Sequence, residues 1–416
     1  CNTRCKCRCR YGTILMALIQ SFKGWFWFFL AMLYGIKSFC LTFRGQIISA
    51  HGSKIGTPFS PRRTFSTART GSLLSRMVGE AAAPYSDIPQ TDSGPLFKFG
   101  IISDIQYADI EDGTGFSGRP RYYRHSLDIL KAAAQDWSER GDVDFAVHLG
   151  DILDIHCPAE EADGALSRVI DAFNIFPKRT YHLVGNHCLY NHPRQVLNER
   201  LCIESAEADC SYYAFQHKDF VFVSLDGYDI SMTGREEGSP KYKAAETILR
   251  AINPNEDNLN SPKGLEGLDR RFVRFGGGVG LQQLEWLRSV LGQARAEGKR
   301  VVVFCHQPIH PTEGLHVCLL WNYDEVLQVL QIHSDVVVAT FAGHAHRGCY
   351  AVDMLGIHHK VVEAALECPR NSTAFGHIEV YEDRLVLKGK GIIETTEMKF
   401  NFFEQETEKI ESVTGS

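Results

Sequence analysis

The chain has 416 residues, enough for one large domain with an extension, and its 44% apolar and 23% charged residues are typical of a soluble globular protein. Its net charge of −6 conceals an asymmetry. Residues 1–79 contain twelve Lys and Arg and no acid, which leaves 32 basic residues against 50 acidic ones in the rest. An acidic body argues against a general nucleic-acid-binding protein, which needs a basic surface. It does not argue against a small anionic substrate, because bound metal ions can dominate the charge of a site.

The acid-free N-terminal extension, residues 1–79, has three interpretations. In the first, Met77 is the natural start and residues 1–76 do not belong to the working protein. In the second, the Ser, Thr and Arg composition of residues 41–79 marks an organelle transit peptide. In the third, the apolar residues 12–36 anchor the chain in a membrane, although two polar residues interrupt them.

The cysteines bear on the compartment. Eight of the thirteen are scattered beyond the first 40 residues without a CxxC pair, which favours a reduced intracellular compartment over a disulfide framework. We expect a cytoplasmic protein, or a plastid or mitochondrial one if residues 41–79 act as a transit peptide. Changes in composition predict an extension over 1–79, a linker over 80–95, a main domain over 96–400 and a tail over 401–416.

Periodicity predicts alternating strands and helices in the main domain. Short apolar runs predict strands at residues 97–103, 144–149, 180–184, 300–305 and 335–341, a hairpin at 212–215 and 220–225, and shorter strands at 360–364, 378–381 and 384–388. Helical spacing of apolar residues predicts helices at 122–140, 165–176, 281–291 and 324–332. The polar, Gly-rich residues 227–280 lack a regular pattern, and we expect an insertion that covers or shapes a site. Strand–helix alternation followed by paired strands predicts an α/β sandwich of layered sheets with flanking helices.

Five short polar motifs follow five of the predicted strands. They are Asp104-Ile105-Gln106, Gly150-Asp151-Ile152-Leu153-Asp154, Gly185-Asn186-His187, His306-Gln307-Pro308 and Gly343-His344-Ala345-His346. The carboxyl ends of strands in α/β sheets form ligand sites, and glycine lets the backbone turn sharply so that a side chain points to a common centre. Carboxylate, amide oxygen and imidazole without thiolate are ligands for hard to borderline divalent metals. One such motif alone is usually turn chemistry, but five in this order predict a metal centre.

This set of motifs resembles that of the calcineurin-like metallophosphoesterases, and the resemblance covers about residues 97–390. It implies one αββα sandwich domain that binds two divalent metal ions. Asp151 is implied to bridge both ions, and His187 to stand outside the ligand shell near the leaving oxygen. The other implied ligands are Asp104, Gln106 and His346 at the first ion and Asn186, His306 and His344 at the second.

The resemblance also implies the reaction. Solvent between the two ions becomes a hydroxide near neutral pH and attacks phosphorus in line with the leaving group. His187 then stabilises the pentavalent state or protonates the leaving oxygen. Most of the superfamily has Asp-x-His in the first motif, whereas this chain has Gln106, so its first site holds three oxygens and one nitrogen. Oxygen-rich sites suit Mn²⁺ or Mg²⁺ better than Zn²⁺, and we expect a preference for Mn²⁺.

Three further segments accompany the Gln variant: Ser103-Asp104-Ile105-Gln106-Tyr107-Ala108-Asp109, Arg121-Tyr122-Tyr123-Arg124-His125-Ser126 and Trp321-Asn322-Tyr323. Together they resemble the Mn²⁺-dependent ADP-ribose/CDP-alcohol diphosphatase family. That resemblance implies hydrolysis of ADP-ribose to AMP and ribose 5-phosphate. It also implies cleavage of CDP-choline, CDP-ethanolamine or CDP-glycerol to CMP and a phospho-alcohol.

Candidate substrate-binding residues follow the first motif. Phe116, on a Gly-rich loop, offers a ring that stacks on a base, or it packs the loop. Arg119 and Arg121 offer guanidinium groups to a diphosphate, or they are solvated surface. For Arg124 a structural role on the predicted helix is favoured.

A second group follows the fourth motif. Asn322 and Tyr323 line the substrate pocket, or they begin a helix that Asn322 caps. Cys318 lies in the same segment, and a catalytic role for it requires a lowered pKa. Asp154 is not an implied ligand, and we expect it to orient a neighbouring side chain.

Other functions remain open at this point. The motifs also fit a metallophosphoesterase that acts on cyclic nucleotides, phosphomonoesters or phosphoproteins, and an inactive metal-binding scaffold is a further alternative. The expected partners are small molecules linked through a nucleoside diphosphate, with no nucleic acid. We expect a monomer, with membrane attachment only if residues 12–36 are an anchor.

Overall fold

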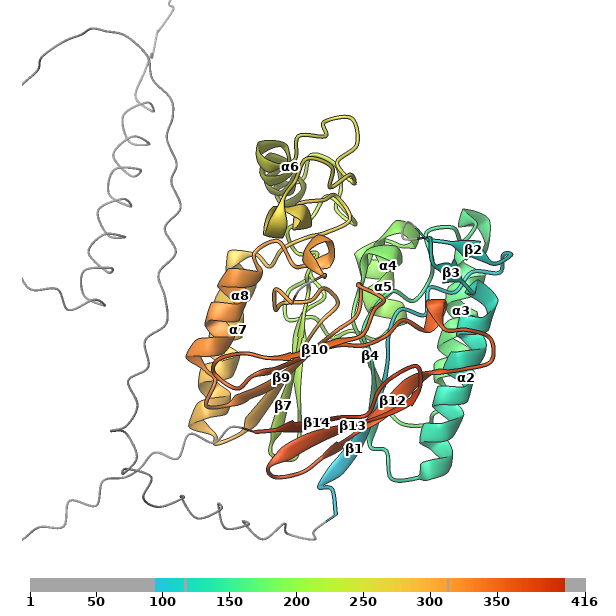
Figure 1. The fold of residues 1–416 in the computed structure, drawn as a ribbon, viewed down its shortest axis with the longest axis vertical. Coiled ribbons are helices and arrows are strands. Elements are labelled where there is room, and N and C mark those ends of the chain that lie inside the picture. Colours follow the sequence, from blue (N-terminus) through green and yellow to red (C-terminus); the bar gives the residue numbers. More distant parts are fainter. Residues whose placement is uncertain (1–93, 116–117, 313, 401–416) are drawn as a thin grey trace, which may run out of the picture. The chain divides into compact units, whose positions relative to one another are not determined.

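The computed structural model describes residues 94–115, 118–312 and 314–400. In this part of the chain two six-stranded sheets pack face to face, with helices on both outer sides (Figure 1). The fold is therefore the expected αββα sandwich. The expected extension and tail lie outside the described residues, as does almost all of the linker. No helix within the described ranges is long and apolar enough to cross a membrane.

The first sheet has the strand order β14-β13-β12-β1-β4-β5. Three of its strands, β1, β4 and β5, are parallel, and the others continue the sheet antiparallel from β1. The bounds are β1 Phe97–Ile102, β4 Phe145–His148, β5 Thr180–His182, β12 Ala374–Val380, β13 Arg384–Gly391 and β14 Thr396–Lys399.

The second sheet has the order β10-β11-β9-β8-β7-β6, with four parallel strands between two antiparallel edges. The bounds are β6 Tyr213–His217, β7 Phe220–Leu225, β8 Arg300–Cys305, β9 Val337–Ala342, β10 Cys349–Val352 and β11 His358–Val361. The central strands are near-continuous apolar runs, because each is covered by a helix on one face and by the other sheet on the opposite face.

Two pairs of helices cover the outer faces: α2 (Tyr123–Arg140) and α3 (Ala162–Phe173) on the first sheet, and α7 (Leu281–Ala296) and α8 (Tyr323–Ile332) on the second (Figure 1). Each buries one apolar stripe, as the periodicity predicted, although α3 begins and ends three residues earlier than expected. Helix α2 packs close to β1 because Gly100 has no side chain, and a Cβ there would meet the ring of Trp137.

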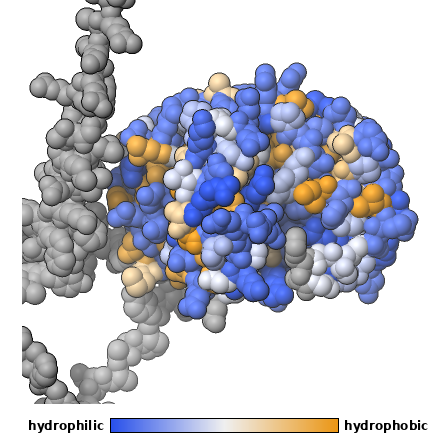
Figure 2. Space-filling model, turned by 90° about the horizontal axis from the view of Figure 1, so that it is seen from above, coloured by the Kyte–Doolittle hydropathy of each residue, from blue (hydrophilic) through white to orange (hydrophobic). Residues whose placement is uncertain are grey.

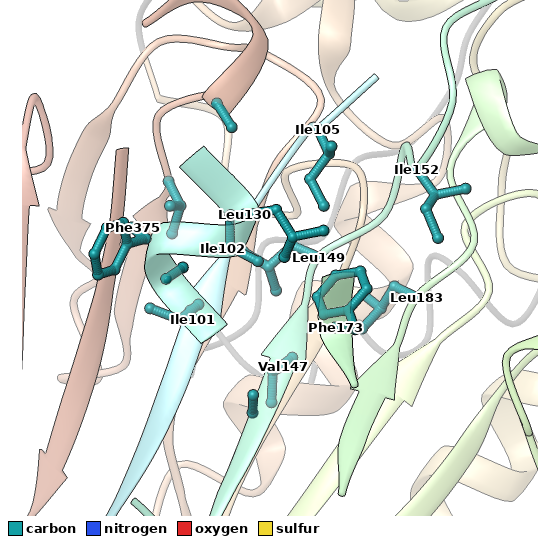
Figure 3. Close-up of a cluster of buried hydrophobic side chains, with 14 of the residues drawn as sticks. Ile101, Ile102, Ile105, Leu130, Val147, Leu149, Ile152, Phe173, Leu183 and Phe375 are labelled. Atoms are coloured by element: carbon teal, nitrogen blue, oxygen red, sulfur yellow. The ribbon is translucent and has the colours of Figure 1, made fainter. Parts of the chain in front are cut away.

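Aromatic side chains fill the space between the sheets. Phe99 and Phe145 of the first sheet meet Phe222 of the second at ring-centroid distances of 5.5 and 5.2 Å. Other apolar side chains of the same core cluster, most of them aliphatic, pack under α2 and α3 (Figure 3). The two layers of core fix β1, β4 and β5, whose carboxyl ends carry the first three polar motifs.

The prediction that residues 227–280 lack regular structure is wrong. They contain α6 (Pro240–Ile252) and a short 3-10 helix, η2 (Gly267–Arg271). Helix α6 has a start signal, because the Ser239 hydroxyl accepts a hydrogen bond from the Tyr242 backbone and Pro240 is the first helical residue. Further elements with no prediction are the strands β10 and β14, together with β2 Gly113–Thr114, β3 Pro120–Arg121, η1 Ala159–Glu161, α4 Asn186–Asn191, α5 Arg194–Arg200, η3 His316–Cys318 and η4 Ala365–Glu367.

Candidate metal centre

Seven polar side chains converge where parallel strands of both sheets end. Asp104 and Gln106 follow β1, Asp151 follows β4, and Asn186 follows β5. The second sheet contributes three imidazoles, His306 after β8 and His344 and His346 after β9. All seven are buried or nearly so, and they are the ligands that the resemblance implies.

The backbone at this centre is unusual. Seven non-glycine residues of the described ranges have positive φ, and five of them belong to the centre. Their φ angles are 48° at Asp104, 42° at Gln106, 60° at Asp151, 64° at His344 and 58° at His346. A left-handed conformation costs free energy for any residue with a Cβ, and such residues gather at functional sites. The turn aims each of these side chains away from its strand and into the space between the motifs.

The glycines of the motifs have a different role from the expected one. Only Gly150 has a positive φ, 105°. Gly185 has a φ of −107°, and a Cβ there would meet the carboxylate of Asp151. A Cβ at Gly343 would likewise meet the carboxylate of Asp104. The expectation of sharp turns at all three glycines is therefore wrong, since two of them are needed for close approach of the backbone to a carboxylate.

The donor atoms are spaced as ligands of metal ions are. The Gln106 amide lies 3.0 Å from Asp151 Oδ2 and 2.9 Å from His346 Nε2. His306 Nε2 lies 3.2 Å from Asp151 Oδ2, and His344 joins these two within 4.8 Å. Neighbouring ligands of one octahedral ion of the size of Mg²⁺ lie about 3 Å apart. Asp151 is thus close to donors on both sides of the centre.

Several of these atoms are buried with no hydrogen-bond partner. They include Gln106 Oε1, His306 Nε2 and His344 Nε2. A buried polar atom without a partner costs free energy unless something else satisfies it. Burial lowers the pKa of His344 to about 3, so that its imidazole is neutral and keeps a lone pair. These observations fit residues that hold divalent cations.

The two carboxylates add negative charge to this buried space. Burial opposes ionisation of Asp151, but the neighbouring imidazoles of His306 and His187 hold its pKa below the usual range. Burial also opposes a charge on His346, yet hydrogen bonds that His346 donates to the carboxylates of Asp104 and Glu367 raise its pKa to about 9. Positive charge is therefore stabilised where these side chains meet.

Partners behind the candidate ligands fix their orientation. His346 Nδ1 lies 2.8 Å from Glu367 Oε1, and His306 Nδ1 lies 2.8 Å from the Leu149 carbonyl. Each bond turns Nε2 toward the centre, as is usual for histidine ligands. Glu367 was not identified from the sequence, because it follows no motif and lies on the 3-10 helix η4 (Ala365–Glu367).

Tyr228 orients the amide of Asn186. Its hydroxyl donates to Asn186 Oδ1 at 3.1 Å, and burial raises its pKa well above the usual value, which keeps it a donor. Two hydrogen bonds fix the backbone of Tyr228: its N–H donates to Asp226 Oδ1, and its carbonyl accepts from Arg194. Arg194 and Asp226 form a buried ion pair at 2.6 Å. No sequence signal marked Tyr228.

His187 lies beside the centre rather than in it. Its backbone N–H donates to Asp151 Oδ1 at 2.8 Å. Its Nδ1 accepts from the Ile155 backbone N–H at 3.0 Å, so the neutral ring carries its proton on Nε2. The carboxylate of Asp154 lies 3.3 Å from the same Nδ1, and Arg121 pairs with that carboxylate at 3.0 Å. Asp154 thus contacts His187. Its expected role, to orient a neighbouring side chain, stays a prediction.

The other candidate substrate residues have structural partners. Asn322 bonds to the N–H and the carbonyl of Val279, and Tyr323 lies beside the Arg271 guanidinium. Burial raises the pKa of the Cys318 thiol to about 12, which leaves it protonated. Arg124 pairs with Asp109 and Glu111 on the surface. Phe116 lies outside the described residues, and the role of each of these residues in substrate binding stays a prediction.

Comparisons with known proteins place the chain in a family. A family model described as calcineurin-like phosphoesterase matches residues 97–348. A protein of Oryza sativa subsp. japonica, named manganese-dependent ADP-ribose/CDP-alcohol diphosphatase, is 46% identical over 307 residues, which cover 74% of this chain and 95% of the relative. A human protein of the same name is 39% identical over 325 residues, with 74% and 94% covered.

A solved structure supports the same family assignment. The crystal structure of a dimetal phosphatase from Danio rerio matches with a TM-score of 0.71 and 40% sequence identity, and it covers 74% of this chain and all of its own. The αββα fold, the matched family model and these relatives lead to one conclusion. The chain is an enzyme of the calcineurin-like metallophosphoesterases and belongs to the family of manganese-dependent ADP-ribose/CDP-alcohol diphosphatases.

Proposed function

We propose that the chain hydrolyses the diphosphate bond of ADP-ribose, giving AMP and ribose 5-phosphate. CDP-alcohols such as CDP-choline are the second proposed substrate class, giving CMP and phosphocholine. The observation that carries the proposal is the buried donor set with Gln106 in it, in a chain whose relatives are named for these substrates. A monomer in the cytoplasm stays our prediction.

The proposed ligands form two sites that share Asp151. Asp104, Gln106 and His346 complete the first site. Asn186, His306 and His344 complete the second. Ligation by Gln106 needs its amide oxygen, rather than its nitrogen, turned toward Asp151 and His346, which a half-turn of the amide achieves. The oxygen-rich first site and the names of the relatives support Mn²⁺, with Mg²⁺ as the alternative.

Bound divalent ions supply Lewis-acid stabilisation of phosphoryl oxygens and a lowered pKa for coordinated water. The remaining chemistry belongs to the chain's own groups. His187, with its proton on Nε2, is placed to donate that proton to the leaving oxygen. The Ile155 N–H holds its ring in position. The carboxylate of Asp154, which pairs with Arg121, lies beside the same ring.

The direct test is metal-dependent turnover by the purified chain. Mn²⁺, Mg²⁺ and Zn²⁺ are supplied in turn with ADP-ribose, CDP-choline, 2′,3′-cyclic AMP and p-nitrophenyl phosphate. We expect release of AMP or CMP, fastest with Mn²⁺. Preference for a cyclic or monoester substrate would contradict the proposed substrates, and bound metal without turnover would favour an inactive scaffold.

Replacing His187 by Ala separates proton transfer from metal binding. We expect both ions to remain bound while kcat falls about a hundredfold to ten-thousandfold, the usual contribution of a general acid. Metal content and initial rates are measured on the same preparation. His156→Ala is the control, since the His156 side chain is exposed and the hydrogen bond from its backbone N–H to Asp154 Oδ1 survives the change. Loss of metal from His187→Ala would make His187 a ligand instead.

Replacing Tyr228 by Phe removes only the hydroxyl that holds Asn186. We expect one of the two Mn²⁺ affinities to fall about tenfold to a hundredfold, as for other residues that orient a metal ligand. Titration of the apo protein with Mn²⁺, followed by calorimetry, measures this. Tyr213→Phe is matched to it, because Tyr213 is a buried phenol that donates to the His182 carbonyl. Unchanged Mn²⁺ affinities in Tyr228→Phe would contradict the assigned role.

A further inference from the structure

A cavity of about 650 Å³ lies beside His346. Its volume is in the range of small-molecule sites. The walls come from the segment before α2, the loop after β9 and the loop after β11. The other charged residues that line it are Arg119, Arg347, Glu363 and Glu367. Because His346 lines the cavity and belongs to the candidate metal centre, a group bound here is next to a phosphate bound at the centre.

Each acid in the cavity wall has a cationic partner. Glu367 Oε2 pairs with Arg119 Nε at 3.0 Å, and its Oε1 bonds to His346. Glu363 pairs with Lys360, which is itself buried, at 3.5 Å. The carboxylates are therefore neutralised within the wall.

Arg347 differs from these residues. Its side chain is exposed and has no hydrogen bond or ion pair to any described residue. Arg119 uses only its Nε in the pair with Glu367, so its terminal nitrogens are not engaged by that contact. With Glu367 paired to Arg119 and Glu363 paired to Lys360, Arg347 is left as an unpaired positive charge among the described residues of the cavity wall. Figure 2 looks down on the end of the molecule that carries β2, β3 and α4 in Figure 1, and most of that face is hydrophilic.

A diphosphate substrate needs contacts for both of its phosphates. The candidate metal centre would hold one phosphate, and the other would require donors next to that centre. Guanidinium groups match phosphate oxygens in charge and geometry. We propose that the cavity beside His346 binds the second phosphate of the substrate through Arg347 and Arg119, and disfavours a cationic group attached to that phosphate. This inference rests on the proposed diphosphatase function.

The proposal separates two substrates that share a nucleotide. CDP-glycerol carries a neutral, hydroxyl-rich alcohol, whereas CDP-choline carries a quaternary ammonium. A free guanidinium in the cavity repels the ammonium, so the wild-type chain should have the higher kcat/KM for CDP-glycerol. ADP-ribose, with a neutral ribose beyond its second phosphate, belongs with CDP-glycerol.

The test is charge reversal at Arg347. In Arg347→Glu we expect kcat/KM for ADP-ribose and CDP-glycerol to fall about tenfold to a hundredfold, the usual contribution of a charge-assisted phosphate contact. CDP-choline should lose less, so that the CDP-glycerol/CDP-choline ratio falls about tenfold. Arg288→Glu, on the exposed face of α7, makes the same change in net charge and should leave the ratio unchanged. An unchanged ratio in Arg347→Glu would overturn the proposal.

A binding measurement keeps the subsite testable without turnover. Calorimetry with the Mn²⁺-loaded chain compares ADP, which has a second phosphate, with AMP, which does not. We expect ADP to bind more tightly than AMP in the wild type, and Arg347→Glu to remove most of this difference. If the wild type fails to cleave diphosphates but this difference depends on Arg347, the proposed function falls and the subsite stands. Equal ADP affinities in the wild type and in Arg347→Glu would overturn the subsite.

Discussion

The site depends on five polar residues held in a left-handed backbone conformation at the ends of parallel strands. Each such residue costs on the order of 1–3 kcal/mol, so together they offset a large part of the roughly 5–15 kcal/mol by which a domain is stable. The neighbouring strands supply the compensation. β1 is held between β4 and β12, and Gln106 N–H donates to the carbonyl of Asp151 across the two motifs. The close-packed core on both faces of these strands holds the strand ends, and with them the left-handed residues, in place.

Electrostatics explains why this strain persists. Asp104 and Asp151 place negative charge in a buried space, which is unfavourable unless cations accompany it. The high pKa of His346 reflects the same demand for positive charge. Partners outside the centre then limit the freedom of the ligands, Glu367 behind His346 and Tyr228 beside Asn186. The same chain of contacts reaches the cavity, because Arg119 pairs with Glu367.

The layered fold and the polar residues at the strand ends were predictable from the sequence because both follow from local patterns, whereas the choice of seven ligands among them came from the resemblance to the calcineurin-like metallophosphoesterases. Apolar runs mark buried strands, and a polar residue directly after such a run lies at the sheet edge. Glu367 and Tyr228 had no such signal, since their roles come from tertiary contacts with residues distant in the chain. Helix α6 was missed although its capping Ser239 and Pro240 were visible, because the surrounding Gly-rich composition suggested a loop. The positive φ angles fell on Asp, Gln and His rather than on most of the adjacent glycines, which composition alone does not reveal.

We propose a centre for two ions that share Asp151 as a ligand. The most direct measurement is the Mn²⁺ content of the chain after dialysis, combined with its electron paramagnetic resonance spectrum. We expect two Mn²⁺ per chain with the spectrum of a magnetically coupled pair, and loss of that coupling in Asp151→Ala. One ion per chain, or two ions without coupling, would contradict a shared carboxylate at the ends of these strands.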